Sequence, residues 1–161
     1  MFEKGSYIFH LRCGICRVDD ISALAGSTSQ DLYYVLQPLY GDSKNSIVRV
    51  PVANAASLRK AMSKAEVEEA LKLFPSFKKD LYITDSKARK VAYETALVGG
   101  DIVQMAPLLA GAKQRKLRDG HLNSMDGQFV SKAEPIIYGV IATGLGLPYE
   151  EVGDYIEKRF G

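Results

Sequence analysis

The sequence predicts an α+β protein in which a small antiparallel β domain precedes a compact all-helical domain. Up to about residue 54, the apolar residues form short runs rich in Val, Ile and Tyr, and Gly-rich turns separate these runs. From residue 63 onward, apolar residues recur with helical spacing behind helix-capping residues. The pattern changes between these points, so we expect a β domain at residues 1–55 and a helical domain at residues 63–161.

The first domain is expected to contain four strands, because four β-forming runs follow one another without an intervening helix. Pro51 has no N–H to donate to a neighbouring strand, so we expect it at a strand end or on a sheet edge. Closely spaced strands of this kind form a small antiparallel sheet or barrel. The expected strands lie at residues 6–11, 16–22, 32–40 and 46–52.

The second domain is expected to contain five helices. Ser63 and Glu66 form a capping box, in which each side chain satisfies a free backbone amide at the helix start. Asn123 is the expected N-cap of the fourth helix, where Asp126 lies in the first turn and favours the helix dipole. Pro135 should kink that helix. The helices are expected to begin near residues 63, 85, 101, 123 and 148.

Charge is distributed unevenly, although the net charge is only +2. Residues 1–58 carry five Lys and Arg and five Asp and Glu. Residues 78–118 carry nine against four, a net of +5, and residues 119–161 carry three against seven, a net of −4. A basic stretch between neutral and acidic parts predicts a surface that faces an anion, and the alternative is a solvated helix face.

The sequence indicates a cytoplasmic protein. No apolar run approaches the ~20 residues that a membrane-spanning helix needs. The first residues lead directly into the first expected strand, without the apolar core of a signal peptide.

Cys13-Gly14-Ile15-Cys16 is the motif that raises the question of a metal or redox site, with His10 three residues upstream. The chain has no further cysteine, and its other histidine, His121, is distant in sequence. A redox C-x-x-C pair normally begins a helix, whose N-terminus lowers the thiol pKa, whereas this pair lies at an expected turn between strands. We therefore expect free thiols that pack, with a metal or dithiol site as the alternative.

Nothing else in the sequence is typical of catalysis. Gly144 and Gly146 follow a helix rather than a strand, so they indicate a helix end and not a phosphate loop. Glu66, Glu68 and Glu69 lie in the first turns of a helix, where acidic side chains favour the dipole. We expect neither an enzyme nor a bound cofactor.

Several segments occur in an order and spacing that one family shares. They are M-F-E-K-G at residues 1–5, Y-Y-V-L-Q-P-L-Y at 33–40, V-R-V-P-V-A-N-A at 48–55, S-K-A-E-V-E-E at 63–69, G-G-D at 99–101 and L-N at 122–123. In these segments the chain resembles the CarD/CdnL family of bacterial transcription regulators, whose N-terminal module also occurs in the transcription-repair coupling factor.

The resemblance implies a Tudor-like β-barrel that binds the β subunit of RNA polymerase by adding a strand to the edge of its sheet. It also implies that the helical domain lies on promoter DNA at the upstream edge of the bubble. There the domain modulates the stability of the open complex without reading sequence, because phosphate contacts position a protein but do not specify bases. We expect a monomer with no small-molecule substrate.

The resemblance also implies site residues. Arg49 matches one of two arginines with which the family contacts polymerase, whereas the other aligns with Leu24. The family's basic position at the second helix is best matched by Arg89. The residues expected to contact DNA phosphates are Lys87, Arg89 and Lys90, followed by Arg115 and Lys116.

The chain departs from the family at the position of a tryptophan that enters the DNA minor groove. That position is Ser86 here, and the chain contains no Trp. A serine cannot unstack a base step as an aromatic wedge does. Tyr82 either substitutes for the wedge or packs between helices. The departure leaves open a second function, a protein-interaction adaptor that keeps the Tudor-like module but no longer binds DNA.

Overall fold

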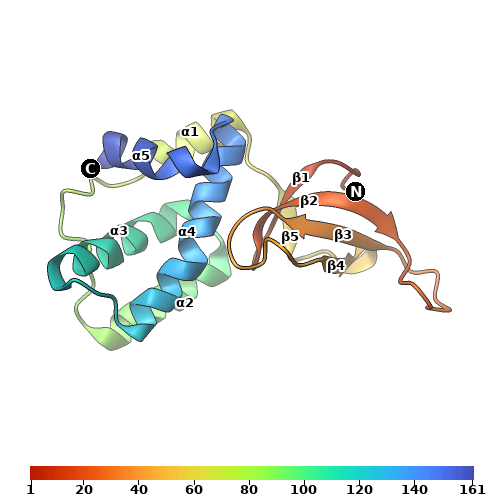
Figure 1. Cartoon of the computed structure of the whole chain (residues 1–161), viewed down its shortest axis with the longest axis horizontal. Helices are drawn as coiled ribbons and strands as arrows, with labels where there is room; N and C mark the ends of the chain where they lie inside the picture. The colour runs from red at the N-terminus through yellow and green to blue at the C-terminus, as the bar shows by residue number, and fades with distance from the viewer. The chain divides into compact units, whose positions relative to one another are not determined.

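The computed structural model describes all 161 residues. The chain forms two compact units, Met1–Ala61 and Met62–Gly161, which are coloured red to yellow and yellow to blue in Figure 1. The first unit contains the strands and the second contains the α-helices, so the expected α+β organisation with a helical C-terminal part is confirmed. None of the helices is long and apolar enough to cross a membrane.

The first unit is a curled antiparallel sheet with the strand order β4-β3-β2-β1-β5. β4 and β5 are its two edges and do not pair with each other, so the sheet is an open half-barrel rather than a closed barrel. The four expected strands are present, with the expected ends shortened by up to two residues in most cases. The strands are β1 (Tyr7–His10), β2 (Gly14–Ser22), β3 (Tyr33–Pro38), β4 (Val48–Pro51) and β5 (Leu58–Lys60).

β5 was not expected, and the expected range of the β domain, residues 1–55, ends before it. It has only three residues, of which Leu58 is buried and the two that follow are exposed cations. It is held by pairing with β1, where Ile8 lies opposite Lys60 and His10 opposite Leu58. A strand this short has no recognisable period, and its partner lies about fifty positions earlier in the chain.

Alternation of side chains builds the core of the β unit. Along β3, Tyr34, Leu36 and Pro38 are buried while the residues between them are partly exposed. The buried cluster on this face consists of Ile8, Cys16, Val18, Tyr34, Leu36, Val50 and Leu58. Phe2 extends the cluster, because its ring packs edge-on against Tyr34 at 5.6 Å and its N–H donates to the Tyr34 hydroxyl.

The second unit contains five helices, and each begins within one residue of the position that the sequence indicated. Ser63, Asp85, Asp101 and Asn123 each accept a backbone N–H of the first helical turn, and the capping box of Ser63 is complete. The helices are α1 (Lys64–Lys72), α2 (Ser86–Gly99), α3 (Ile102–Asp119), α4 (Ser124–Leu145) and α5 (Tyr149–Phe160).

α4 is the central helix of this unit and packs against each of the other four, as Figure 1 shows. Its 22 residues include Pro135, which the structure accommodates within one uninterrupted helix. The helix is buried along most of its length, and Phe129 stacks on Tyr93 of α2 with ring centroids 4.1 Å apart. In the first turn of α4, Ser124 is exposed but the Asp126 side chain is buried inside the unit, where a carboxylate needs partners.

Candidate functional site

The β4 edge of the sheet carries unpaired backbone groups. β4 pairs with β3, and the Val52 N–H donates to the Leu32 carbonyl at 3.0 Å. Hydrogen-bonded and non-hydrogen-bonded pairs alternate along an antiparallel ladder. Counting from Val52, the backbone groups of Val50 face β3, whereas those of Arg49 and Pro51 point away from it. Arg49 thus offers a free N–H and a free carbonyl, and Pro51 offers a carbonyl only.

The Arg49 side chain lies on the outer face of this edge. It is exposed, and it has neither an ion-pair partner nor a hydrogen-bond partner. Ile47, directly before β4, is 58% exposed. Leu24, where the family has its second arginine, is also exposed and adds no charge. The edge therefore combines unpaired backbone groups, one free cation and exposed apolar side chains.

Cys13 lies in the turn between β1 and β2, as expected, whereas Cys16 lies within β2, and both are free thiols. Cys16 is fully buried in the core of the sheet, and burial raises its pKa to about 12. The His10 ring closes the turn, because its Nδ1 accepts the N–H groups of Arg12 and Cys13. Burial and the Arg12 charge lower the pKa of His10, which favours the neutral acceptor form. The structure holds no group of three or more potential metal-ligating side chains.

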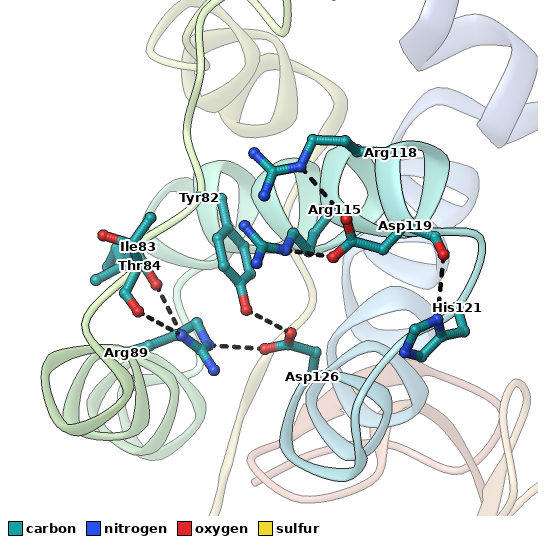
Figure 2. Close-up of polar contacts among 9 residues, drawn as sticks. All are labelled: Tyr82, Ile83, Thr84, Arg89, Arg115, Arg118, Asp119, His121 and Asp126. Carbon is teal, nitrogen blue, oxygen red and sulfur yellow. Dashed lines mark hydrogen bonds and ion pairs between the residues drawn. The ribbon is translucent and has the colours of Figure 1, made fainter.

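Asp126 is the centre of a buried polar network in the helical unit (Figure 2). Its side chain is fully buried. Its Oδ1 accepts from Arg89 Nε at 2.9 Å and from the Tyr93 hydroxyl at 2.8 Å, and its Oδ2 accepts from the Tyr82 hydroxyl at 2.7 Å. Burial, together with the hydrogen bond to Asp126, raises the pKa of both tyrosines, so they remain protonated donors. The network joins α2, α4 and the segment before α2.

The structure corrects the role expected of Arg89. The residue is only 5% exposed, and its Nη1 donates to the carbonyls of Ile83 and Thr84 while Nε binds Asp126. A guanidinium engaged on both sides inside the unit is not available to a DNA phosphate. The sequence placed Asp126 only at a helix start, and its pairing with a residue 37 positions earlier had no local signal.

Tyr82 packs between cations and is not exposed as a wedge. The guanidinium carbon of Arg89 lies 4.7 Å from its ring centroid and that of Arg115 lies 4.8 Å from it. With its hydroxyl on Asp126, the ring is held by three side chains, as Figure 2 shows. Of the two alternatives for Tyr82, the structure therefore supports packing.

The other residues expected to contact DNA lie at the surface. Lys87 and Lys90 are exposed on α2, and Lys90 lies 4.0 Å from Glu94. On α3, Lys116 is exposed without a side-chain partner, and the Arg115 Nε is 2.6 Å from an Asp119 carboxylate oxygen. The residues are thus divided between the N-terminal half of α2 and the C-terminal turns of α3.

A basic cleft of about 300 Å³ lies beside the last turns of α3. Asp119 binds Arg115 and also Arg118, at 2.6 and 3.3 Å (Figure 2). Lys78 and Lys79, from the segment after α1, are exposed and face the same cleft. We did not single out Lys78, Lys79 or Arg118 from the sequence, although all three belong to the basic stretch. We define the basic cleft by its four cations, Lys78, Lys79, Arg115 and Arg118.

The fold and these surfaces define a two-unit α+β protein with an open-edged small sheet and a helical unit that carries exposed cations. Residues 2–62, essentially the whole β unit, match the family model of the CarD-like/TRCF RID domain. The chain therefore carries a domain of this CarD-like family, as the resemblance indicated. The domain is a non-catalytic interaction module and indicates a transcription-related protein that interacts with RNA polymerase. A comparison with curated proteins found no match.

Proposed function

We propose that this protein is a bacterial transcription regulator that binds the β subunit of RNA polymerase and contacts promoter DNA near the upstream edge of the bubble. In this proposal it modulates open-complex stability without reading sequence, and it acts as a cytoplasmic monomer. The observation that carries the proposal is the CarD-like/TRCF RID match over residues 2–62 in a unit whose β4 edge is unpaired. The half-barrel takes the place of the family's Tudor-like module.

Strand addition at β4 is the proposed mode of polymerase binding. A backbone carbonyl of a strand laid along this edge would accept a hydrogen bond from the Arg49 N–H, and N–H groups of that strand would donate to the carbonyls of Arg49 and Pro51. The Arg49 guanidinium would bind a carboxylate of the partner, and a hydrogen bond of this charge-assisted kind is worth about 1.5–3 kcal/mol. Backbone pairing then supplies much of the affinity, and the arginine selects an acidic partner.

Phosphate contact is the proposed mode of DNA binding. Lys87, Lys90, Arg115 and Lys116 remain the proposed contacts, because the three lysines are exposed and Arg115 is partly exposed. Arg89 leaves this set and instead stabilises the start of α2 from inside the unit. Ser86, the first residue of α2, is exposed but too small to unstack bases. Contact with the backbone alone fits a factor whose position on the promoter is set by polymerase.

Two measurements on the full chain test the proposal. The first is capture of RNA polymerase from the source organism, which we expect for the native protein and expect to weaken with Arg49→Glu. The second is the half-life of the open complex at a test promoter, with and without the protein. Failure to capture polymerase would refute the proposal. Capture without any effect on the open complex, and without salt-dependent DNA binding, would favour the adaptor function instead.

A further inference from the structure

The Gln114 side chain fixes a segment that has no regular secondary structure of its own. Its Oε1 accepts the Leu81 N–H at 3.0 Å, and its Nε2 donates to the carbonyls of Phe77 and Lys79 at 2.8 and 2.7 Å. Residues 77–81 are thereby hydrogen-bonded to α3 by a single amide, which uses both of its N–H donors and its acceptor.

The same segment lies in direct backbone contact with α3. A Cβ at Gly111, one turn before Gln114, would lie 2.8 Å from the Leu81 carbonyl oxygen and 2.9 Å from the Tyr82 nitrogen. No side chain fits in that space, so the close approach requires glycine. The segment is also held at its start, where the Phe77 N–H donates to the Phe160 carbonyl. Lys78 and Lys79 therefore project from a backbone that is anchored on both sides of them.

This anchoring brings cations of two elements together around the basic cleft. The four cations face two carboxylates, Asp80 and Asp119, which leaves a net charge of +2. Lys78 and Lys79 have no ion-pair partner. Holding like charges in one cleft is unfavourable unless an anion accompanies them, and a concave basic surface concentrates anions.

The cleft suits a phosphate better than a nucleic-acid base. The guanidinium groups of Arg89 and Arg115 both lie against the Tyr82 ring. The Phe77 ring packs against the Phe160 ring, with centroids 5.5 Å apart. Each ring already has a cation or a second ring as its partner, which disfavours stacking of a base on it. A volume of about 300 Å³ is ample for a phosphate and part of its hydration.

We propose that the basic cleft binds a phosphate of the DNA backbone, and that Gln114 is the positioning residue that presents Lys78 and Lys79 to it. The proposal rests on the proposed function for the source of the phosphate, and it names a contact site separate from α2. It assigns binding to Lys78, Lys79 and Arg118 in addition to Arg115. Gln114 itself does not touch the phosphate and acts through the lysines.

The test is the salt dependence of binding between the full-length protein and a short duplex DNA, without polymerase. Each neutralised phosphate contributes about 0.9 to the slope of log K against log salt. Lys78→Ala/Lys79→Ala should flatten the slope by about 0.9 if the cleft holds one phosphate. Gln114→Met, which keeps the side-chain length and changes no charge, should flatten it by a similar amount. Lys132→Ala/Lys158→Ala removes two exposed, unpaired lysines outside the cleft and should leave the slope unchanged.

A native slope for the double variant at Lys78 and Lys79 would overturn the proposal, as would an equal loss in the control at Lys132 and Lys158. Both cleft lysines are exposed, so their removal tests the site without depending on the fold. A native slope for folded Gln114→Met, measured below its thermal midpoint, would overturn the positioning role. Polymerase capture is measured separately. A native slope for the cleft variants together with intact capture refutes the cleft alone, whereas a flattened slope together with failure of the native protein to capture polymerase refutes the proposed function alone.

Discussion

Arg49 allows the backbone and side-chain contributions of the β4 edge to be separated. Its N–H points away from β3, so Arg49→Pro removes an outward donor together with the side chain but breaks no hydrogen bond within the sheet. Arg49→Ala removes the side chain alone. Val50→Pro is the contrasting change, because the Val50 N–H faces β3 and its loss removes a bond of the ladder.

The expected magnitudes follow from these contacts. Loss of one charge-assisted hydrogen bond in Arg49→Ala should cost about 1.5–3 kcal/mol of binding to polymerase, or roughly 10–150-fold in Kd. Arg49→Pro should cost a further 0.5–1.5 kcal/mol or so, about 2–10-fold, for the backbone bond to the added strand. The two variants should differ little in thermal stability, whereas Val50→Pro should destabilise the β unit.

The assay is equilibrium binding of each full-length variant to purified RNA polymerase, with thermal denaturation of each variant alone as the check on folding. Equal affinity of folded Arg49→Pro and folded Arg49→Ala would refute strand addition at β4, because the outward N–H would then have no partner. Native affinity for both would remove Arg49 and this edge from the proposed interface.

Three further outcomes are expected. Asp126→Ala should destabilise the helical unit by about 3–5 kcal/mol in chemical denaturation, because it leaves the Arg89 charge buried and unpaired; a loss below 1 kcal/mol or so would contradict the central place of the network. Burial raises the pKa of Cys16 to about 12, so the folded state keeps a proton that an unfolded thiol loses at about pH 8.5. The contribution of this thiol to the free energy of unfolding is therefore complete below about pH 8.5 and is lost as the pH rises toward 12. Cys16→Ala should flatten this decline in stability. Ser86→Trp should lengthen the open-complex half-life and leave the slope of log K against log salt unchanged, because unstacking of bases neutralises no charge. As a contrast, Lys87→Ala should flatten that slope by about 0.9 if Lys87 reaches a phosphate.

The helices and the longer strands could be predicted because their signals are local. Ser63 and Asn123 lie directly before the helices that they cap, and β3 alternates buried and exposed residues along its length. β5 lacked such a signal. It owes its place to β1, and no pattern within Leu58–Lys60 distinguishes it from a linker.

The candidate site was predicted less completely, because contacts between distant residues decide which cations are free. Arg89 and Lys90 are adjacent in a basic run, yet Arg89 is buried and Lys90 is exposed. Only the position of Asp126 explains this difference, since a buried guanidinium requires a buried acceptor. The basic cleft was missed for a related reason: Lys78 and Arg118 are separated by forty positions and meet through the hydrogen bonds of Gln114.

The open β4 edge also has a consequence for association of the protein with itself. A row of unpaired backbone groups that accepts a partner strand can accept a second copy of the same strand, which is the usual route to edge-to-edge aggregation. β4 limits this, because it has only four residues and Pro51 withholds one outward donor. Two copies paired along this edge would also bring their Arg49 guanidinium groups onto neighbouring strands, where like charges repel. The positive charge of Arg49 therefore repels a second copy of the strand and attracts an acidic partner. Removal of Arg49 should increase concentration-dependent self-association.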